Sequence, residues 1–326
     1  MDTKFFLNWA KEKNLIEVFL GENIHEEILK RGLNVFRFFA IRKSLTNTIY
    51  DLIWKNCLEK HESIAIQIQQ LICDILPFID EKDKFYIFEK IKLEVNNKLD
   101  ENYLNFIKNF TINCVKKEYL TERDQLNAHY GIPLFWQLLQ DTNKPRNISE
   151  MDNLCNSLCE ILDLQVIDNA VKESFIEKCF ENIKKNSSIV QSIKLIRRLF
   201  DKLINSNYKN KKVLIFLNRL DNNFKILDLI LNEFERYMKI VKVQIKNNNS
   251  SNASSNDYFS FIFEGTYTHK ENIEARLDLI HFFCNDLKES KLDFKAENLE
   301  LLWNLFVINA NSESEKIILY KFLGNK

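Results

Sequence analysis

Three cysteines in one stretch of the chain are the residues best suited to chemistry. Cys155 and Cys159 are four residues apart on a predicted helix, and Cys179 follows downstream. A structural zinc ion takes four ligands at ordered spacings, commonly CxxC or HxxxH pairs, and no histidine lies near these thiols. We therefore interpret the three cysteines as small apolar residues on helix stripes, and we predict no metal site.

The histidines are the next candidates, as general bases. His61 and His129 stand at predicted helix starts, His25 lies on a charged helix, and His281 lies inside an apolar stretch. None has a sequence neighbour that identifies it as an oriented catalytic base. The motifs GxGxxG, GxxxxGK[ST], HExxH and GxSxG do not occur in the sequence. We predict no catalytic residue and no cofactor in this chain.

The elements that would position any site are predicted to be helices. The 326 residues include only five glycines and three prolines, well below the average usage of about 7% and 5%. Hairpin turns and phosphate-binding loops depend on those residues, so strand-rich and loop-rich folds are excluded. Apolar residues instead recur at helical spacing, for example at 64, 68, 71, 72, 75 and 76. An all-α fold follows.

Start and stop signals divide this pattern into short helices. Thr46 precedes an apolar stripe, and Ser149, three residues before Asp152, resembles the start of a capping box. Pro77 closes a helix that ends at Leu76, whereas Gly32 falls inside a predicted helix and indicates a break there. The polar residues 246–257, KNNNSSNASSND, have nothing to bury and predict a mobile loop.

Tryptophan marks a faint internal repeat. Trp54, Trp136 and Trp303 each follow two large apolar residues on a predicted helix, and they are spaced by 82 and 167 residues. Those spacings are close to two and four units of about 41 residues, the size of HEAT and armadillo repeats. Chance recurrence of tryptophan is the alternative explanation. Because a two-helix unit cannot bury its apolar face alone, such units stack into an elongated array.

Charge and terminal sequence indicate the setting. The chain carries 46 basic and 46 acidic residues, so its net charge gives no case for nucleic acid as a partner. Its apolar runs are too short for a membrane span. The N-terminus lacks the apolar core of a signal peptide, and the seven cysteines suit a reducing compartment. We expect a cytoplasmic protein, with the nucleus as the alternative location.

Several stretches resemble one family in collinear order over residues 46–323. Residues 49–55, IYDLIWK, followed by 60–64, KHESI, are similar to the "DLIW…GKHE(A/S)I" segment in the armadillo-like region of large fat-facets-type ubiquitin-specific proteases. The stretch 134–138, LFWQL, resembles that region's "LLWNL" helix, and 267–277, YTHKENIEARL, resembles its "YSHVQEVQERL" helix.

The resemblance implies a helical array that flanks a papain-like deubiquitinase domain in a much longer enzyme. Such catalytic domains need a glycine-rich cysteine box and histidine box. Cys114 stands in TINCVKK without glycines, and the AHYG sequence at His129 falls where the family has helical repeats. The resemblance therefore carries no catalytic residue over to this chain.

Together these observations predict one armadillo/HEAT-like domain over residues 1–326, a right-handed superhelical solenoid of stacked helical hairpins. Its expected role is that of a non-catalytic scaffold that binds proteins, either ubiquitinated substrates or adaptor proteins, as a fragment or truncated relative of a deubiquitinase. The alternatives are a HEAT-type transport or import adaptor, an arm of an active ubiquitin thioesterase whose catalytic domain lies outside this chain, and a nucleic-acid-binding protein.

Overall fold

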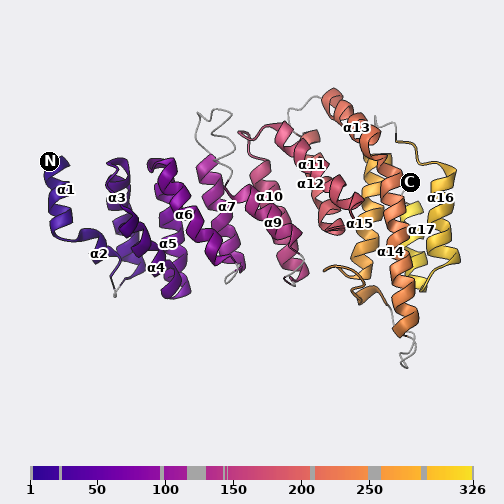
Figure 1. Cartoon of the computed structure of the whole chain (residues 1–326), viewed down its shortest axis with the longest axis horizontal. Helices are drawn as coiled ribbons and strands as arrows, with labels where there is room; N and C mark the ends of the chain where they lie inside the picture. Colours follow the sequence, from indigo (N-terminus) through magenta and orange to yellow (C-terminus); the bar gives the residue numbers. More distant parts are fainter. Residues whose placement is uncertain are drawn as a thin grey trace. The chain divides into compact units, whose positions relative to one another are not determined.

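Every regular element in the described part of the chain is helical (Figure 1). This confirms the predicted all-α class. The helices form two compact units, Met1–Trp136 and Gln137–Lys326, so the single domain over 1–326 stays a prediction. The computed structural model describes residues 3–21, 24–95, 99–115, 130–141, 144, 146–205, 210–248, 258–287 and 292–324.

In the first unit several helices pack against the helix after next, and some also pack against a neighbour in sequence. Helix α5 contacts α3, α4 and α7, and α4 contacts α6. The last helix, α9, runs across the boundary between the two units. The helices are α1 (Thr3–Glu12), α2 (Leu15–Phe19), α3 (Glu26–Ile41), α4 (Asn47–Glu59), α5 (Glu62–Ile75), the 3₁₀ turn η1 (Leu76–Phe78), α6 (Glu81–Glu94), α7 (Glu101–Val115) and α9 (Gly131–Gln140).

The second unit follows the same pattern of packing. Helix α12 contacts α10, α11 and α15, and α15 contacts α14 and α17. Two of its helices, α15 and α16, continue directly into π-helical turns, η3 and η4. The elements are α10 (Ile148–Leu162), α11 (Asn169–Lys184), α12 (Ile189–Asn205), α13 (Asn210–Phe224), α14 (Ile226–Asn248), the 3₁₀ turn η2 (Tyr258–Ser260), α15 (His269–His281), η3 (Phe282–Asp286), α16 (Ala296–Trp303), η4 (Asn304–Ile308) and α17 (Glu313–Gly324).

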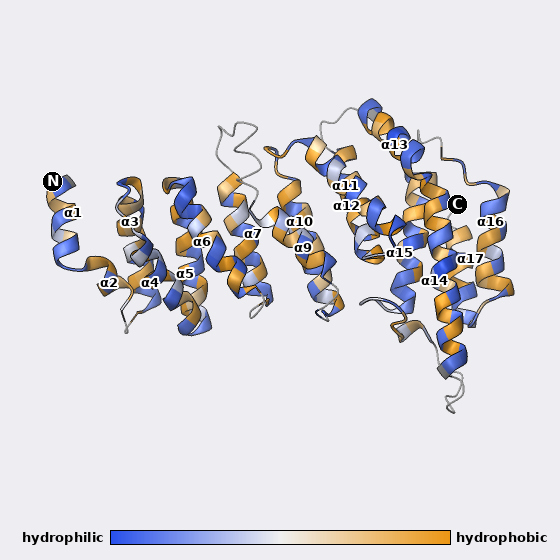
Figure 2. Ribbon diagram, in the orientation of Figure 1, coloured by the Kyte–Doolittle hydropathy of each residue, from blue (hydrophilic) through white to orange (hydrophobic). Residues whose placement is uncertain are grey.

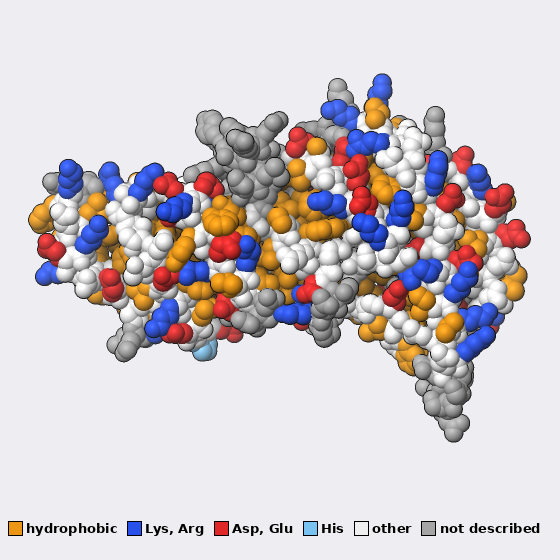
Figure 3. All heavy atoms as spheres, viewed as in Figure 1, with side chains coloured by type: hydrophobic (Ala, Val, Ile, Leu, Met, Phe, Trp, Pro, Cys, Tyr) orange, Lys and Arg blue, Asp and Glu red, His pale blue; other side chains and the backbone are white. Residues whose placement is uncertain are grey.

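Each unit has its own apolar core, because most helices present one apolar and one polar face (Figure 2). In the first unit Phe36, Ile68 and Phe110 are completely buried, and in the second Phe180 and Phe200 are as well. Burial of one such side chain contributes about 1.5–3 kcal/mol. On the face shown in Figure 3, basic and acidic side chains are interspersed, in keeping with the zero net charge.

Several predicted helix boundaries are confirmed, and one is wrong. Thr46 is the N-cap of α4, and Pro77 lies in the 3₁₀ turn that follows α5. Helix α10 begins at Ile148, and its N-cap is Asn147, two residues before the predicted Ser149. Its capping box is made by Asn147 and Glu150, which exchange side-chain and backbone hydrogen bonds. In this Asn-x-x-Glu pattern the Asn147 side chain accepts from the Glu150 backbone N–H, and the Glu150 side chain accepts from the Asn147 backbone N–H.

The predicted break at Gly32 is also wrong, since α3 runs through it without interruption. The glycine serves packing: an added Cβ would lie 3.0 Å from the ring of Phe19. Of the predicted loop 246–257, residues 246–248 belong to α14, and the others lie outside the described residues.

The three repeat tryptophans lie on α4, α9 and α16 but differ in environment. Trp54 is 8% exposed, whereas Trp303 is 41% exposed. Trp54 lies near the ring of Phe106, at 6.4 Å between centroids, while Trp303 lies 6.2 Å from the ring of Tyr320. A shared sequence setting therefore does not give a shared degree of burial.

Candidate functional site

The three candidate cysteines are core residues of the second unit. Cys155 and Cys159 lie on α10 and Cys179 on α11, and all three are buried. The hydrogen bond with Cys155, together with burial, raises the pKa of the Cys159 thiol, and burial raises that of Cys179. Within the described residues no group of three histidine, cysteine or acidic side chains is placed to hold a metal ion.

The candidate histidines are dispersed over the described helices. His25 and His61 occupy the N-cap positions of α3 and α5, and the His61 ring accepts a hydrogen bond from the Ser63 backbone N–H. His281 ends α15, with its Nδ1 atom 3.4 Å from an Asp286 oxygen. His129 lies outside the described residues. No two of the placed candidates share a site.

A histidine that the sequence did not single out as a candidate base lies at the centre of a buried polar network. His269, the first residue of α15, is completely buried. Its Nδ1 atom is 2.9 Å from the Tyr237 hydroxyl on α14, and its Nε2 atom is 3.0 Å from a Glu315 carboxylate oxygen on α17. Glu315, also completely buried, accepts hydrogen bonds from the backbone and side-chain N–H groups of Asn311 at 2.8 and 3.1 Å. The network thereby joins three helices.

The same face of α15 carries a buried ion pair. The Arg276 guanidinium donates to both carboxylate oxygens of Glu233 on α14, at 2.6 and 3.0 Å, and also to the backbone oxygen of Asn272 at 2.7 Å. It lies 4.6 Å from the centroid of the Tyr237 ring. His269, Asn272 and Arg276 all belong to the stretch YTHKENIEARL, so this family-like motif fixes the packing of α15.

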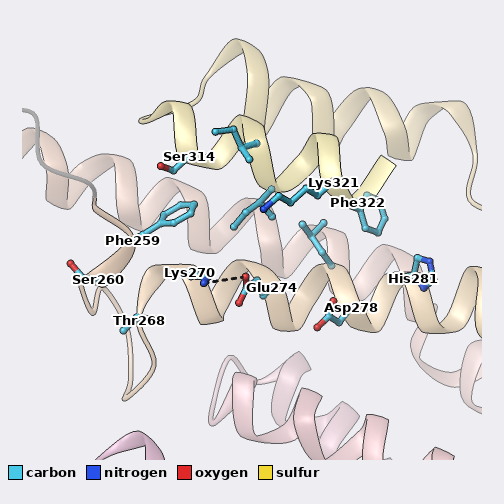
Figure 4. A pocket seen from close by; sticks show the side chains of 13 residues that line it. Phe259, Ser260, Thr268, Lys270, Glu274, Asp278, His281, Ser314, Lys321 and Phe322 are labelled. Carbon is cyan, nitrogen blue, oxygen red and sulfur yellow. Dashed lines mark ion pairs between the residues drawn. The ribbon is translucent and has the colours of Figure 1, made fainter. Parts of the chain in front are cut away.

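The opposite, outer side of α15 forms one wall of a groove of about 940 Å³, and α17 forms the other (Figure 4). The two helices run in the same direction, and Phe259 and Ser260 border one end of the groove. The apolar side chains of Leu277, Ile317, Ile318 and Phe322 line it. At the far end the ring of His281 meets that of Phe322 edge-on, at 6.3 Å between centroids.

Charged side chains border this apolar lining. Lys270 and Glu274 form an ion pair at 3.8 Å along α15. Asp278 on the same helix and Lys321 on α17 form no hydrogen bond or ion pair within the described part of the chain. Although Asp278 is an exposed residue, partial burial raises the pKa of its carboxyl group, against the opposite effects of His281 and Arg197.

The groove has the apolar lining and charged border of a surface that binds a ligand, and none of its described lining residues is a cysteine that could act as a nucleophile. The Thr268 hydroxyl is engaged with Glu271 in the capping box of α15. The positions Lys270, Glu274 and Asp278 recur at helical spacing in the sequence, but nothing local shows that α17 packs beside them. Sequence reasoning therefore missed this site.

No helix among the described residues combines the length and the apolar character that a membrane crossing requires.

Comparisons with known proteins agree with the helical repeat and with the predicted resemblance. The chain matches the model of the UBP24/USP9X/USP9Y ARM repeat over residues 1–326. It is 20% identical over 331 residues to the probable ubiquitin carboxyl-terminal hydrolase FAF of Drosophila melanogaster, which covers 97% of this chain. It is 22% identical over 318 residues to ubiquitin carboxyl-terminal hydrolase 9Y of Homo sapiens, and 21% to ubiquitin carboxyl-terminal hydrolase 9X of Mus musculus, each covering 93% of the chain.

These relatives are far longer than the matched region. The alignment covers 11% of the fly protein and 12% of the human and mouse proteins. What is shared is thus the helical repeat, and the match extends along the whole sequence. The chain belongs to the UBP24/USP9X/USP9Y ARM repeat family.

Proposed function

We propose that this chain is a non-catalytic helical-repeat scaffold that binds a partner protein in the groove between α15 and α17. The groove itself is the observation that supports this function. It combines about 940 Å³ of space, an apolar lining and a border of charged residues. Protein-binding sites typically have an apolar centre inside a polar rim.

The relatives suggest the context of this binding. Their names describe ubiquitin carboxyl-terminal hydrolases, of which the matched region is 11–12%. We propose that the chain acts in the cytoplasm as the partner-binding arm of such an enzyme, holding a ubiquitinated substrate or an adaptor protein. The hydrolytic chemistry would then belong to a catalytic domain outside this chain.

A peptide-display experiment tests the groove. The full chain is immobilised and used to select from a random 12-residue peptide library, and binding of the selected peptides is then measured on variants. The variant Ile317→Asp places a charge on the groove wall, where the isoleucine is 51% exposed. We expect it to weaken binding at least tenfold.

The matched control is Ile215→Asp on α13. Ile215 is 61% exposed and does not line the groove, so this variant should bind like the wild type. Equal binding by wild type and Ile317→Asp would rule out the groove as the binding site. A fluorogenic ubiquitin conjugate should remain uncleaved by the chain, because the proposed scaffold has no hydrolytic role.

A further inference from the structure

The two walls of the groove are the exposed stripes of two α-helices. On α15 the lining positions Lys270, Glu274 and Asp278 are separated by four residues, which places them along one helix face. On α17 the positions Ile317 and Lys321 have the same separation. A third helix is the element that naturally packs between two such stripes, because its side-chain ridge enters the groove that they form.

Contacts at the two ends define the length of the groove. Near one end His269 on α15 bonds to Glu315 on α17, and at the other end His281 contacts Phe322. His269 and His281 are the first and last residues of α15. At a rise of 1.5 Å per residue, the distance along the helix is about 18 Å, or about three helical turns.

Two basic residues of α12 that line the smaller cavity beside Asp278 form ion pairs with other acidic residues. Arg197 forms ion pairs with Asp201 and, at 3.5 Å, with Asp286. Lys194 pairs with Asp152 at 2.8 Å.

The lysine nearest along α15 is engaged too, because Lys270 pairs with Glu274. Asp278 therefore forms no ion pair within the described residues, although Arg197 and His281 act on its charge from a longer distance. It lies where the groove meets a smaller cavity of about 260 Å³ between α12 and α15. Across the groove, Lys321 likewise lacks an anion, and Figure 4 shows its side chain extending along the groove.

We propose that the groove binds one amphipathic α-helix of a partner protein. The helix has an apolar stripe about three turns long, bordered on one side by a lysine or arginine that pairs with Asp278 and on the other by an acidic residue that pairs with Lys321. This inference rests on the proposed scaffold function and specifies the chemistry of the partner. Helix-in-groove recognition of this kind uses apolar anchors at positions i, i+3 or i+4, and i+7.

A second display library tests the proposal. It contains 14-residue peptides with Leu, Ile, Met or Phe at the anchor positions of one helical stripe. The positions beside that stripe vary among Lys, Arg, Gln, Glu and Asp. Selection on the full wild-type chain should enrich peptides with a basic residue on one side of the stripe and an acidic residue on the other, by about tenfold over the neutral versions.

Charge reversal in the groove supplies the specific control. Asp278→Lys leaves lysines on both walls, so selection should shift to acidic residues on both sides of the stripe. Lys321→Glu leaves acids on both walls and should shift selection to basic residues. Both positions are exposed, and circular dichroism should show unchanged helix content. A purely structural role of either residue would not reverse the charge preference of the peptides.

Each outcome bears on one of the two proposals. If selected peptides lose binding on Ile317→Asp but show no charge preference, the partner chemistry is wrong and the scaffold function stands. If a library with proline at the central position binds equally well, the bound segment is not a helix. If neither library yields peptides that Ile317→Asp disrupts, the groove function and the partner inference both fail.

Discussion

Helix α15 has two faces that differ in the burial and pairing of their charged residues. On the inner face Arg276 and His269 are completely buried, and each has close polar partners on neighbouring helices. On the outer face Asp278 has no hydrogen bond or ion pair within the described residues. A satisfied buried group fixes the arrangement of helices, whereas an unsatisfied exposed group remains available to a ligand. The contrast separates the part of α15 that maintains the fold from the part that we propose binds a partner.

Removing the buried ion pair should have the largest effect on this contrast. Arg276→Ala removes the buried guanidinium and leaves the Glu233 carboxylate with the partly exposed Arg236, 2.9 Å away, as its remaining cation. Removing one partner of a buried pair in this way costs about 3 kcal/mol, the lower end of the usual range. We expect that loss in the unfolding free energy of the second unit, measured by urea denaturation with circular dichroism. A loss below about 1 kcal/mol would show that Arg236 or water compensates the Glu233 carboxylate, and that the ion pair with Arg276 does not fix the inner face.

Changing the contact between His269 and Glu315 should lower the unfolding free energy by less than Arg276→Ala does, but still measurably. Glu315→Gln keeps the size of the side chain and turns one acceptor oxygen into a donor, which then faces the N–H groups of Asn311 or His269. We expect a loss of about 1–3 kcal/mol in unfolding free energy. An unchanged stability would mean that the amide finds acceptors the carboxylate does not use.

The outer face should respond to pH in a specific direction. Because partial burial raises the pKa of Asp278 above its ordinary value of 3.8, the folded chain binds more protons than the unfolded chain between the two pKa values. The unfolding free energy therefore falls as pH rises through that window. Asp278→Asn lacks this effect.

The two proteins should accordingly diverge as pH rises from about 3.8, with the asparagine variant the more stable at pH 7. Parallel urea titrations between pH 3 and pH 7 provide the measurement. A stability difference that is the same at every pH would show that Asp278 has the same pKa folded and unfolded.

The smallest effect is expected at the exposed pair on the same face. Lys270 and Glu274 are 55% and 44% exposed in their side chains. Lys270→Ala should change the unfolding free energy by about 0.5 kcal/mol or less, because exposed i, i+4 pairs contribute little. A larger loss would show that the exposed pair on the outer face also stabilises the fold, as the buried pair on the inner face does.

The sequence predicts the helical class well because that class depends on local pattern. The apolar spacing of residues 64–76 is a property of one short segment, and α5 covers most of it. The scarcity of glycine and proline means that few segments of the chain contain a residue that would interrupt a helix. Gly32 shows where local reasoning fails. A glycine in a helical pattern indicates a break, but the contact with Phe19 on another helix decides its role.

The groove could not be predicted for the same physical reason. Asp278 and Lys321 are 43 residues apart in sequence, and only the packing of α15 beside α17 brings them to one surface. The stretch YTHKENIEARL was found through its resemblance to a family. Its polar composition does not reveal that His269 and Arg276 lie inside the protein while Lys270 and Glu274 lie outside.

The π-helical turn at the end of α15 has a consequence for how related genes can diverge. In this turn the backbone N–H of Leu287 bonds to the oxygen of Phe282, five residues back, and the same pattern joins Asn309 to Asn304 after α16. Such a turn accommodates one residue more than an α-helical turn, so a single codon can be lost there without interrupting the helix. When gene sequences of relatives are aligned, one-codon gaps should collect at residues 282–286 and 304–308, while the preceding helical residues keep a constant length.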